Sequence, residues 1–243
     1  MIDTPLYIPP KECGFANRLI HLTDFFTKFP NGIVHESIRD YGVGQWFDFS
    51  FPLTTETEST KIVQPNIYIG NLEIHSRISS LVKPNKKLIE EFHKYANLIQ
   101  GVRAGLHIRR GLSSKDYLDG EIVSFANDNT VAEFEEIAKH LAPVYVSSDS
   151  ESLKKEHFSE CRTLHAPVAS IFSNDKLYTF IEFLLLSYCP VVFVTEGGQG
   201  GVSTFGYMAA CYGRRPIYFV RDQTFPTLSQ EPNSSTALET PLQ

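Results

Sequence analysis

The chain has 243 residues, of which 42% are hydrophobic and 21% charged. These proportions are typical of a globular protein with enough apolar material for one large or two small domains. The net charge of −6 argues against a general nucleic-acid binder, because such proteins carry a basic face for phosphates. The first residues lack the basic-then-apolar pattern of a signal peptide, and no apolar run approaches the roughly 18 residues of a membrane span. We therefore expect a reducing, cytoplasmic environment and no membrane span.

The residues that commonly hold metals do not cluster in the sequence. The four cysteines are widely spaced, and three of them lie in apolar contexts that are typical of small buried side chains. Most histidines are also scattered without the spacing of a zinc site, namely His35, His75, His93, His140, His157 and His165. We expect no metal site and no bound cofactor.

The amino-terminal part predicts a small α/β unit. An apolar stretch at residues 6–8 indicates a strand, and Gly14 precedes apolar residues at helical spacing. A glycine-containing loop before a helix exposes backbone N–H groups to anions, and Arg18 on the first turn would add a mobile positive charge. Further elements are short strands at 33–34, 62–63 and 67–69, an aromatic cluster at 46–51 that is interpreted as core, and an amphipathic helix at 86–100.

From residue 101 onward, strands and helices alternate. Apolar runs predict strands at 102–108, 144–146, 191–194 and 216–220, and helical periodicity indicates helices at 131–141, 177–188 and 207–212. This alternation predicts a mainly parallel sheet with helices on both faces. The last residues, 223–243, are polar and aperiodic, typical of a tail or of a linker to further parts of a larger chain.

Polar side chains follow three of the predicted strands, at 107–111, 147–150 and 195–204. Because parallel strands point the same way, these segments should line one edge of one sheet. Arg109 and Arg110 would present planar, permanently charged donors suited to a phosphate or carboxylate. Together with the Gly/Ser/Thr segment they predict a pocket for a nucleoside diphosphate.

Simpler interpretations remain open at each of these positions. The two arginines could form a surface ion pair. Asp149 is equally suited to cap the helix that follows it, and Ser203 and Thr204 could cap theirs.

The same residues resemble a known family. Gly14-Phe15-Ala16-Asn17-Arg18-Leu19 is similar to the Gly-x-x-Asn-Arg-Leu loop of the fucosyltransferase-like GT-B glycosyltransferases. His107-Ile108-Arg109-Arg110-Gly111 resembles their His-x-Arg-Arg signature, which the α-1,2-, α-1,6- and O-fucosyltransferases share. Val144–Asp149 and Ser203–Gly206 resemble the segments that follow in that family. The order agrees, and the resemblance spans residues 5–220.

The resemblance implies an α/β fold of the GT-B type, with two Rossmann-like lobes, mainly parallel sheets and a cleft between them. Residues 1–100 would form a reduced, acceptor-side lobe, residues 101–222 the lobe for the nucleotide sugar, and residues 223–243 the tail or linker. The implied activity is metal-independent, inverting transfer of a 6-deoxyhexose from a nucleoside-diphosphate sugar to a hydroxyl of a glycan or glycoconjugate.

The resemblance also implies roles for individual residues. Arg109 would hold the β-phosphate and stabilise the negative charge on the leaving diphosphate. The other donor-binding residues would be Gly14, Asn17, Arg18, His107, Arg110, Asp149, Glu196, Ser203, Thr204 and Phe205. Inverting transfer needs a base for the acceptor hydroxyl, and the candidate carboxylates are Asp116, Asp119, Glu121 and Glu196.

One departure leaves the donor open. The family often has Asp two places after the second Arg, where this chain has Leu112. L-Fucose on GDP and L-rhamnose on UDP or GDP therefore fit equally well.

Two other function classes are compatible with parts of the sequence. Gly198-Gln199-Gly200 with Asp222 imitates a dinucleotide-binding fingerprint, although that motif belongs to a first βαβ unit followed by further strands. A non-catalytic nucleotide-sugar-binding module would have the same anion pocket. A phosphoryl-transfer enzyme is disfavoured, because the chain has no Gly-x-x-x-x-Gly-Lys-Ser/Thr loop.

Overall fold

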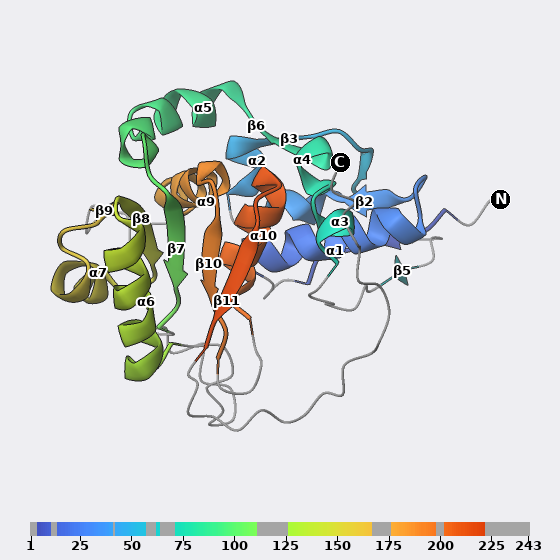
Figure 1. Ribbon diagram of the computed structural model, residues 1–243. Coiled ribbons are helices and arrows are strands. Elements are labelled where there is room, and N and C mark those ends of the chain that lie inside the picture. Colours follow the sequence, from blue (N-terminus) through green and yellow to red (C-terminus); the bar gives the residue numbers. More distant parts are fainter. Residues whose placement is uncertain are drawn as a thin grey trace, which may run out of the picture.

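The computed structural model describes residues 4–10, 14–40, 42–56, 62–63, 71–110, 126–166, 176–197 and 202–221. Within these residues the chain forms two parallel sheets, one in each half (Figure 1). The first sheet has the order β4-β2-β1-β5, with β1 (Leu6–Tyr7), β2 (Ile33–His35), β4 (Leu53–Thr54) and β5 (Ile62–Val63). The second has the order β11-β10-β7-β8-β9, with β7 (Ala104–Ile108), β8 (Val144–Ser148), β9 (Arg162–Thr163), β10 (Val192–Thr195) and β11 (Ile217–Val220).

Helices connect the strands in both halves. The first half contains α1 (Phe15–Lys28), the 3₁₀ helix η1 (Glu36–Arg39), α2 (Val43–Trp46), α3 (Leu72–His75), α4 (Ile78–Leu81), α5 (Lys86–His93) and the 3₁₀ helix η2 (Ala96–Ile99). The second half contains α6 (Asp128–Leu141), α7 (Glu151–His157), α9 (Leu177–Tyr188) and α10 (Thr204–Gly213). An antiparallel pair that the sequence did not predict, β3 (Phe47–Phe49) and β6 (Val82–Pro84), lies in the first half.

Helices cover both faces of the second sheet, as predicted. Strand residues alternate between the faces: Leu106 and Val146 pack with α6 and α7, whereas Tyr145 and Val194 belong to the core that includes α9 and α10. This period of two follows from the pleat of a strand. The α/β fold with parallel sheets is therefore confirmed.

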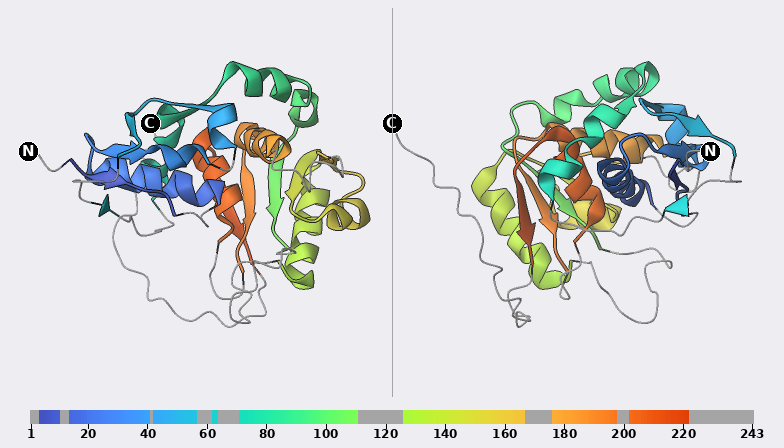
Figure 2. Two further views of the ribbon diagram at one scale, coloured as in Figure 1. Left: turned by 180° about the vertical axis from the view of Figure 1, so that it is seen from behind. Right: turned by 90° about the vertical axis from the view of Figure 1, so that its right-hand side faces the viewer.

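The two halves share one apolar core. Helix α10 packs against α1, α3 and α4 of the first half and against α9 and β10 of the second (Figure 2). The centroid of the Phe15 ring of α1 lies 4.9 Å from the centroid of the Phe180 ring and 5.1 Å from that of the Phe183 ring, both on α9. Trp46 and Phe47 are buried in the same core, as predicted for the aromatic cluster.

The predicted helix at 86–100 was wrong in one respect. The structure divides this segment into α5 and η2, with Lys94 and Tyr95 between them. The N–H groups of Lys94 and Tyr95 donate to the carbonyls three residues before them, those of Glu91 and Phe92 at 3.1 and 2.9 Å, so the α-helical pattern ends there. The strand predicted at 67–69 and the tail predicted at 223–243 lie outside the described residues.

The structure describes three of the four cysteines. Cys189 and Cys211 are buried, and burial raises the pKa of each thiol to about 12. Cys161 is half-buried, and Cys13 lies outside the described residues.

In the part of the chain that the structure describes, every helix is too short or too polar to cross a bilayer.

Candidate functional site

Three strand ends meet at one edge of the second sheet. Strands β7, β8 and β10 are parallel neighbours, and the arrowheads of β7 and β10 point the same way in Figure 1. Hydrogen bonds join the segments that follow them: the Arg110 backbone N–H donates to Asp149 Oδ1 at 2.7 Å, and the Arg109 N–H donates to Thr195 Oγ1 at 3.1 Å. The prediction that these segments line one edge is confirmed.

The two arginines of the edge have different surroundings. The Arg110 guanidinium donates to the Ala126 carbonyl at 2.8 Å and to Asp128 Oδ1 at 3.1 Å, which is the ion pair considered as an alternative for it. Arg109 is half-buried at the end of β7, and its carbonyl accepts from the Ala126 N–H at 2.7 Å. The backbone of Arg109 is thus held on two sides.

Helix α10 begins at this edge without a side-chain cap. Ser203 occupies the N-cap position, but its hydroxyl makes no bond to the backbone of the first turn. Instead, Ser203 Oγ lies 2.9 Å from His107 Nε2. The first N–H groups of a helix have no partner within the helix, so this helix start can interact with an anion.

His107 is enclosed by the same helix start. Its ring lies 5.2 Å from the Phe205 ring, and a Cβ added to Gly206 would approach the His107 side chain to 2.8 Å. Burial, together with the nearby charge of Arg109, lowers the pKa of His107 to about 3. The imidazole is therefore neutral at physiological pH, with one nitrogen donating and the other accepting.

Asp149 does not cap the helix that follows it. Ser150 is the N-cap of α7, and its Oγ accepts from the Leu153 N–H at 3.2 Å. The Asp149 carboxylate instead turns toward the end of β7, where it accepts from Arg110. Of the two interpretations left open for Asp149, the capping role is wrong.

The amino-terminal motif forms part of the first half. Gly14 is the N-cap of α1. Arg18 is 1% exposed, and its guanidinium donates to the carbonyls of Ser37 at 2.7 Å and Pro10 at 3.3 Å. The expectation of a mobile charge on Arg18 was wrong, because these backbone acceptors hold the side chain in place. Donor binding by Gly14, Asn17 and Arg18 stays a prediction.

Several predicted residues lie outside the described part of the chain. These are the candidate bases Asp116, Asp119 and Glu121, and also Leu112, Gly198, Gln199, Gly200 and Asp222. The fourth candidate base, Glu196, is half-buried at the end of β10, where its backbone N–H donates to the Val220 carbonyl at 2.8 Å. Its carboxylate stays a predicted base.

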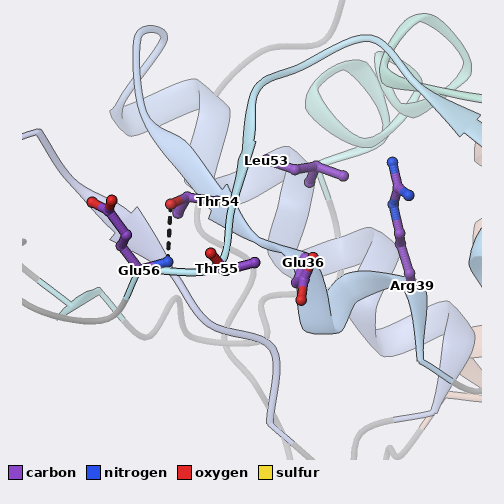
Figure 3. A pocket seen from close by; sticks show the side chains of 6 residues that line it. All are labelled: Glu36, Arg39, Leu53, Thr54, Thr55 and Glu56. Carbon is purple, nitrogen blue, oxygen red and sulfur yellow. Dashed lines mark hydrogen bonds between the residues drawn. The ribbon is translucent and has the colours of Figure 1, made fainter.

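A polar pocket of about 310 Å³ lies in the first half (Figure 3). Its walls come from η1, which follows β2, and from the neighbouring parallel strand β4 and the two residues after it, namely Glu36, Arg39, Leu53, Thr54, Thr55 and Glu56. The Glu56 backbone N–H donates to Thr54 Oγ1 at 3.0 Å. Two carboxylates, a guanidinium and threonine hydroxyls give this pocket both hydrogen-bond donors and acceptors.

The sequence did not single out the polar residues beneath the edge. Ser147 Oγ lies 3.4 Å from His107 Nδ1, and the buried Lys154 Nζ donates to Glu182 Oε1 at 3.2 Å. A signal was present, since Glu182 is the one acidic residue within the strongly apolar segment 177–188. In the described ranges, no group of three or more His, Cys, Asp and Glu side chains is arranged to hold a metal ion.

The chain resembles known proteins in its three-dimensional structure and not in its sequence. No family model matches the chain, and no curated protein matches it in sequence. The structure is similar to NodZ α-1,6-fucosyltransferase soaked with GDP-fucose, with a TM-score of 0.57, 12% identity and coverage of 86% of this chain and 92% of that one. The selenomethionine form of NodZ from Bradyrhizobium gives a TM-score of 0.57 at 13% identity, covering 85% of this chain and 91% of that one.

NodZ co-crystallised with GDP is equally similar, with a TM-score of 0.57, 12% identity and coverage of 85% and 92%. These similarities extend through both halves of the chain, as the sequence resemblance did. The protein therefore has the GT-B-like fold of the fucosyltransferase NodZ.

Proposed function

We propose that the protein is an inverting glycosyltransferase that moves a 6-deoxyhexose from a nucleoside-diphosphate sugar to a hydroxyl of a glycan or glycoconjugate. L-Fucose carried by GDP is the first candidate donor, because the fold is that of a fucosyltransferase. L-Rhamnose on UDP or GDP is the second. The proposed chemistry needs no metal ion, since positively charged groups of the protein would stabilise the leaving diphosphate.

The observation that supports this proposal is the start of α10. Its N-cap side chain is directed to His107 rather than to the helix, and it lies on the edge where Arg109 follows the last residue of β7. A helix N-terminus and a guanidinium together favour a diphosphate, and they also stabilise the charge that grows as the glycosidic bond breaks. The oxidoreductase alternative rests on residues 198–200 and 222, outside the described part.

The first experiment identifies the donor. Thermal unfolding is measured with GDP, UDP, GDP-fucose, GDP-rhamnose, UDP-rhamnose and NADH, because a ligand that binds the folded state raises Tm by mass action. We expect a nucleoside diphosphate and its sugar to stabilise the protein. Stabilisation by NADH alone would favour an oxidoreductase, and donor binding without transfer to any sugar acceptor would favour a non-catalytic module.

Arg109→Ala tests the role of the guanidinium. We expect transfer to fall by at least about a hundredfold, the typical loss when one charge-stabilising donor is removed, with the Tm of the ligand-free protein nearly unchanged. Arg103→Ala is the matched control, since Arg103 is exposed and immediately precedes the amino end of the same strand. Equal turnover by Arg109→Ala and Arg103→Ala would contradict the proposed role.

We further propose that the polar pocket of the first half binds hydroxyl groups of the acceptor. Glu36 and Glu56 would accept hydrogen bonds from sugar hydroxyls, and Arg39 would donate. Glu36→Gln should raise KM for the acceptor severalfold and leave KM for the donor unchanged. Glu73→Gln is the control, because Glu73 is an exposed acid of the first half outside this pocket. A change in donor KM alone would assign the pocket to the other substrate.

A further inference from the structure

Side chains tie the segment that follows β9 to the start of α7. Lys154 of α7 is 2% exposed, and its Nζ donates to the Leu164 carbonyl at 2.7 Å. The same Nζ lies 2.6 Å from Glu151 Oε1 and 3.2 Å from Glu182 Oε1. An ammonium group has three N–H donors, so these three acceptors satisfy it and compensate for its burial. Lys154 therefore holds Leu164 next to the first turn of α7.

His165, the next residue of that segment, is held by the same network. Its Nδ1 lies 2.9 Å from Glu151 Oε2, and its Nε2 lies 2.8 Å from Thr163 Oγ1. Both ring nitrogens are therefore occupied, yet the side chain is 50% exposed. The exposed surface thus belongs largely to the carbon atoms of an aromatic side chain. A ring that is fixed at two points has little rotational freedom left to lose when a flat ligand stacks on it.

The His165 ring lies at the edge of the sheet that carries the candidate site. Strand β9 is next to β8 at the outer end of the sheet and runs parallel to it, with α7 beside them (Figure 1). Residue 165 follows the carboxyl end of β9, as Asp149 follows the carboxyl end of β8. Glu151, which bonds with His165, is two residues beyond Asp149. The imidazole and the Asp149 carboxylate are therefore close to one another at this edge.

The order of the strands determines how a nucleotide would extend along the edge. The proposed diphosphate lies at Arg109 and the start of α10, where β7 and β10 end. Neighbouring strands are roughly 4.8 Å apart, so the end of β9 is about 10 Å from the end of β7 across β8. A ribose and a base extend over a gap of this size. In that direction the edge offers the Asp149 carboxylate as an acceptor and the His165 ring as a stacking surface.

We propose that His165 is the residue on which the base of the donor nucleotide stacks, and that Glu151, itself held by Lys154, is the positioning residue of its ring. This assignment rests on the proposed function and names the base within it. Nucleic-acid bases stack on aromatic side chains, histidine among them. A purine has two fused rings and covers more of an imidazole than the single ring of uracil does, so GDP is favoured over UDP.

Two ligands separate the base from the phosphates. Binding of GDP and of inorganic pyrophosphate is measured by calorimetry for the parent and for His165→Ala. Loss of a stacking side chain should weaken binding of GDP about tenfold. Pyrophosphate has no base, so its affinity should stay unchanged. The parent should also bind GDP more tightly than UDP, and His165→Ala should lose most of this preference.

His157→Ala is the matched control. His157 ends α7 with its side chain 43% exposed and its Nδ1 2.9 Å from Glu135 Oε1. It therefore has nearly the exposure and the glutamate contact of His165, but at the opposite end of the helix. We expect this variant to bind both ligands as the parent does. Equal affinity of His165→Ala and His157→Ala for GDP would overturn the proposal.

Glu151→Ala tests the positioning of the ring. The imidazole remains but loses its partner at Nδ1, so binding of GDP should weaken severalfold because the ring must be ordered on binding. Removal of a negative charge also affects the phosphates, and the ratio of the GDP and pyrophosphate affinities cancels that effect. An unchanged ratio in Glu151→Ala would overturn the role of Glu151.

The carbon-bound ring protons of His165 report the stacking contact directly by NMR. His165→Ala assigns their signals in the spectrum of the parent. Saturating GDP should shift these signals upfield, because they then lie in the ring current of the base, whereas saturating pyrophosphate should leave them in place. A parent that binds GDP without this shift overturns the proposal alone. A parent that binds neither GDP nor pyrophosphate contradicts the proposed function as well.

Discussion

His107 is buried in surroundings that oppose protonation of its ring. It is 5% exposed, between Ser147 and Ser203. Burial of the ring disfavours its charged form, and the nearby Arg109 charge opposes a second positive charge, so the ring is neutral. Protonation of this histidine therefore acts against the folded state.

The consequence is a measurable loss of stability in acid. The pKa of His107 is about 3 in the folded protein against 6.5 for a free histidine, so the unfolded chain binds the proton more readily between these values. This group then lowers the free energy of unfolding by about 1.4 kcal/mol per pH unit as pH falls from 6.5 toward 3. Urea unfolding at several pH values should show a shallower dependence for His107→Asn than for the parent. His93→Gln, at an exposed position of α5, should keep the parent slope.

At the scale of elements, the contact between α9 and α10 depends on one glycine. A Cβ added to Gly213 would lie 1.8 Å from the carbonyl oxygen of Ser187. That neighbour is backbone and cannot rotate away, so the helices would have to separate. The close approach matters for the site, because α10 presents its first turn to the carboxyl edge of the sheet.

Gly213→Ala should therefore destabilise the protein by about 3 kcal/mol or more, at the upper end of the usual cost of overpacking. Gly14→Ala is the control, since a Cβ added there has nothing within 4 Å and we expect a change below about 1 kcal/mol. The two variants are compared by urea denaturation. A loss of the same size in both would show that the α9–α10 approach is not the cause.

At the scale of the whole molecule, polar contacts also join the two halves. His75 of α3 is fully buried, with Nδ1 at 2.7 Å from the Tyr207 hydroxyl of α10 and Nε2 at 3.3 Å from Asp24 Oδ1 of α1. This row of three side chains crosses the shared apolar core. Separating the halves would expose that core and leave buried polar groups without partners.

We therefore expect both halves to unfold together. Trp46, the single tryptophan of the chain, lies in α2 of the first half, so its fluorescence reports on that half. Far-UV circular dichroism reports on helices of both halves. The urea midpoints of the two signals should coincide, as in a two-state transition. A separate, earlier fluorescence transition would show that the first half unfolds independently.

The local elements were largely predictable from the sequence. The helix expected at 177–188 forms as Leu177–Tyr188, and the strand expected at 191–194 forms as Val192–Thr195, because long apolar runs and period-two alternation depend on neighbouring residues alone. The meeting of Arg109, Asp149 and Ser203 at one edge was also predictable, since parallel strands share a direction.

The tertiary structure alone decided which partner each polar side chain has. Arg18 had the pattern of an exposed cation, yet it donates to the carbonyls of Pro10 and Ser37. Lys154 and Glu182 lie on α7 and α9, and only the packing of these helices brings the two side chains together. Periodicity specifies the face on which a residue lies, whereas a hydrogen-bond partner depends on the positions of atoms from distant parts of the chain. For that reason the sequence determined the fold class and the edge that forms the candidate site, and the folded structure determined how that edge is held and connected.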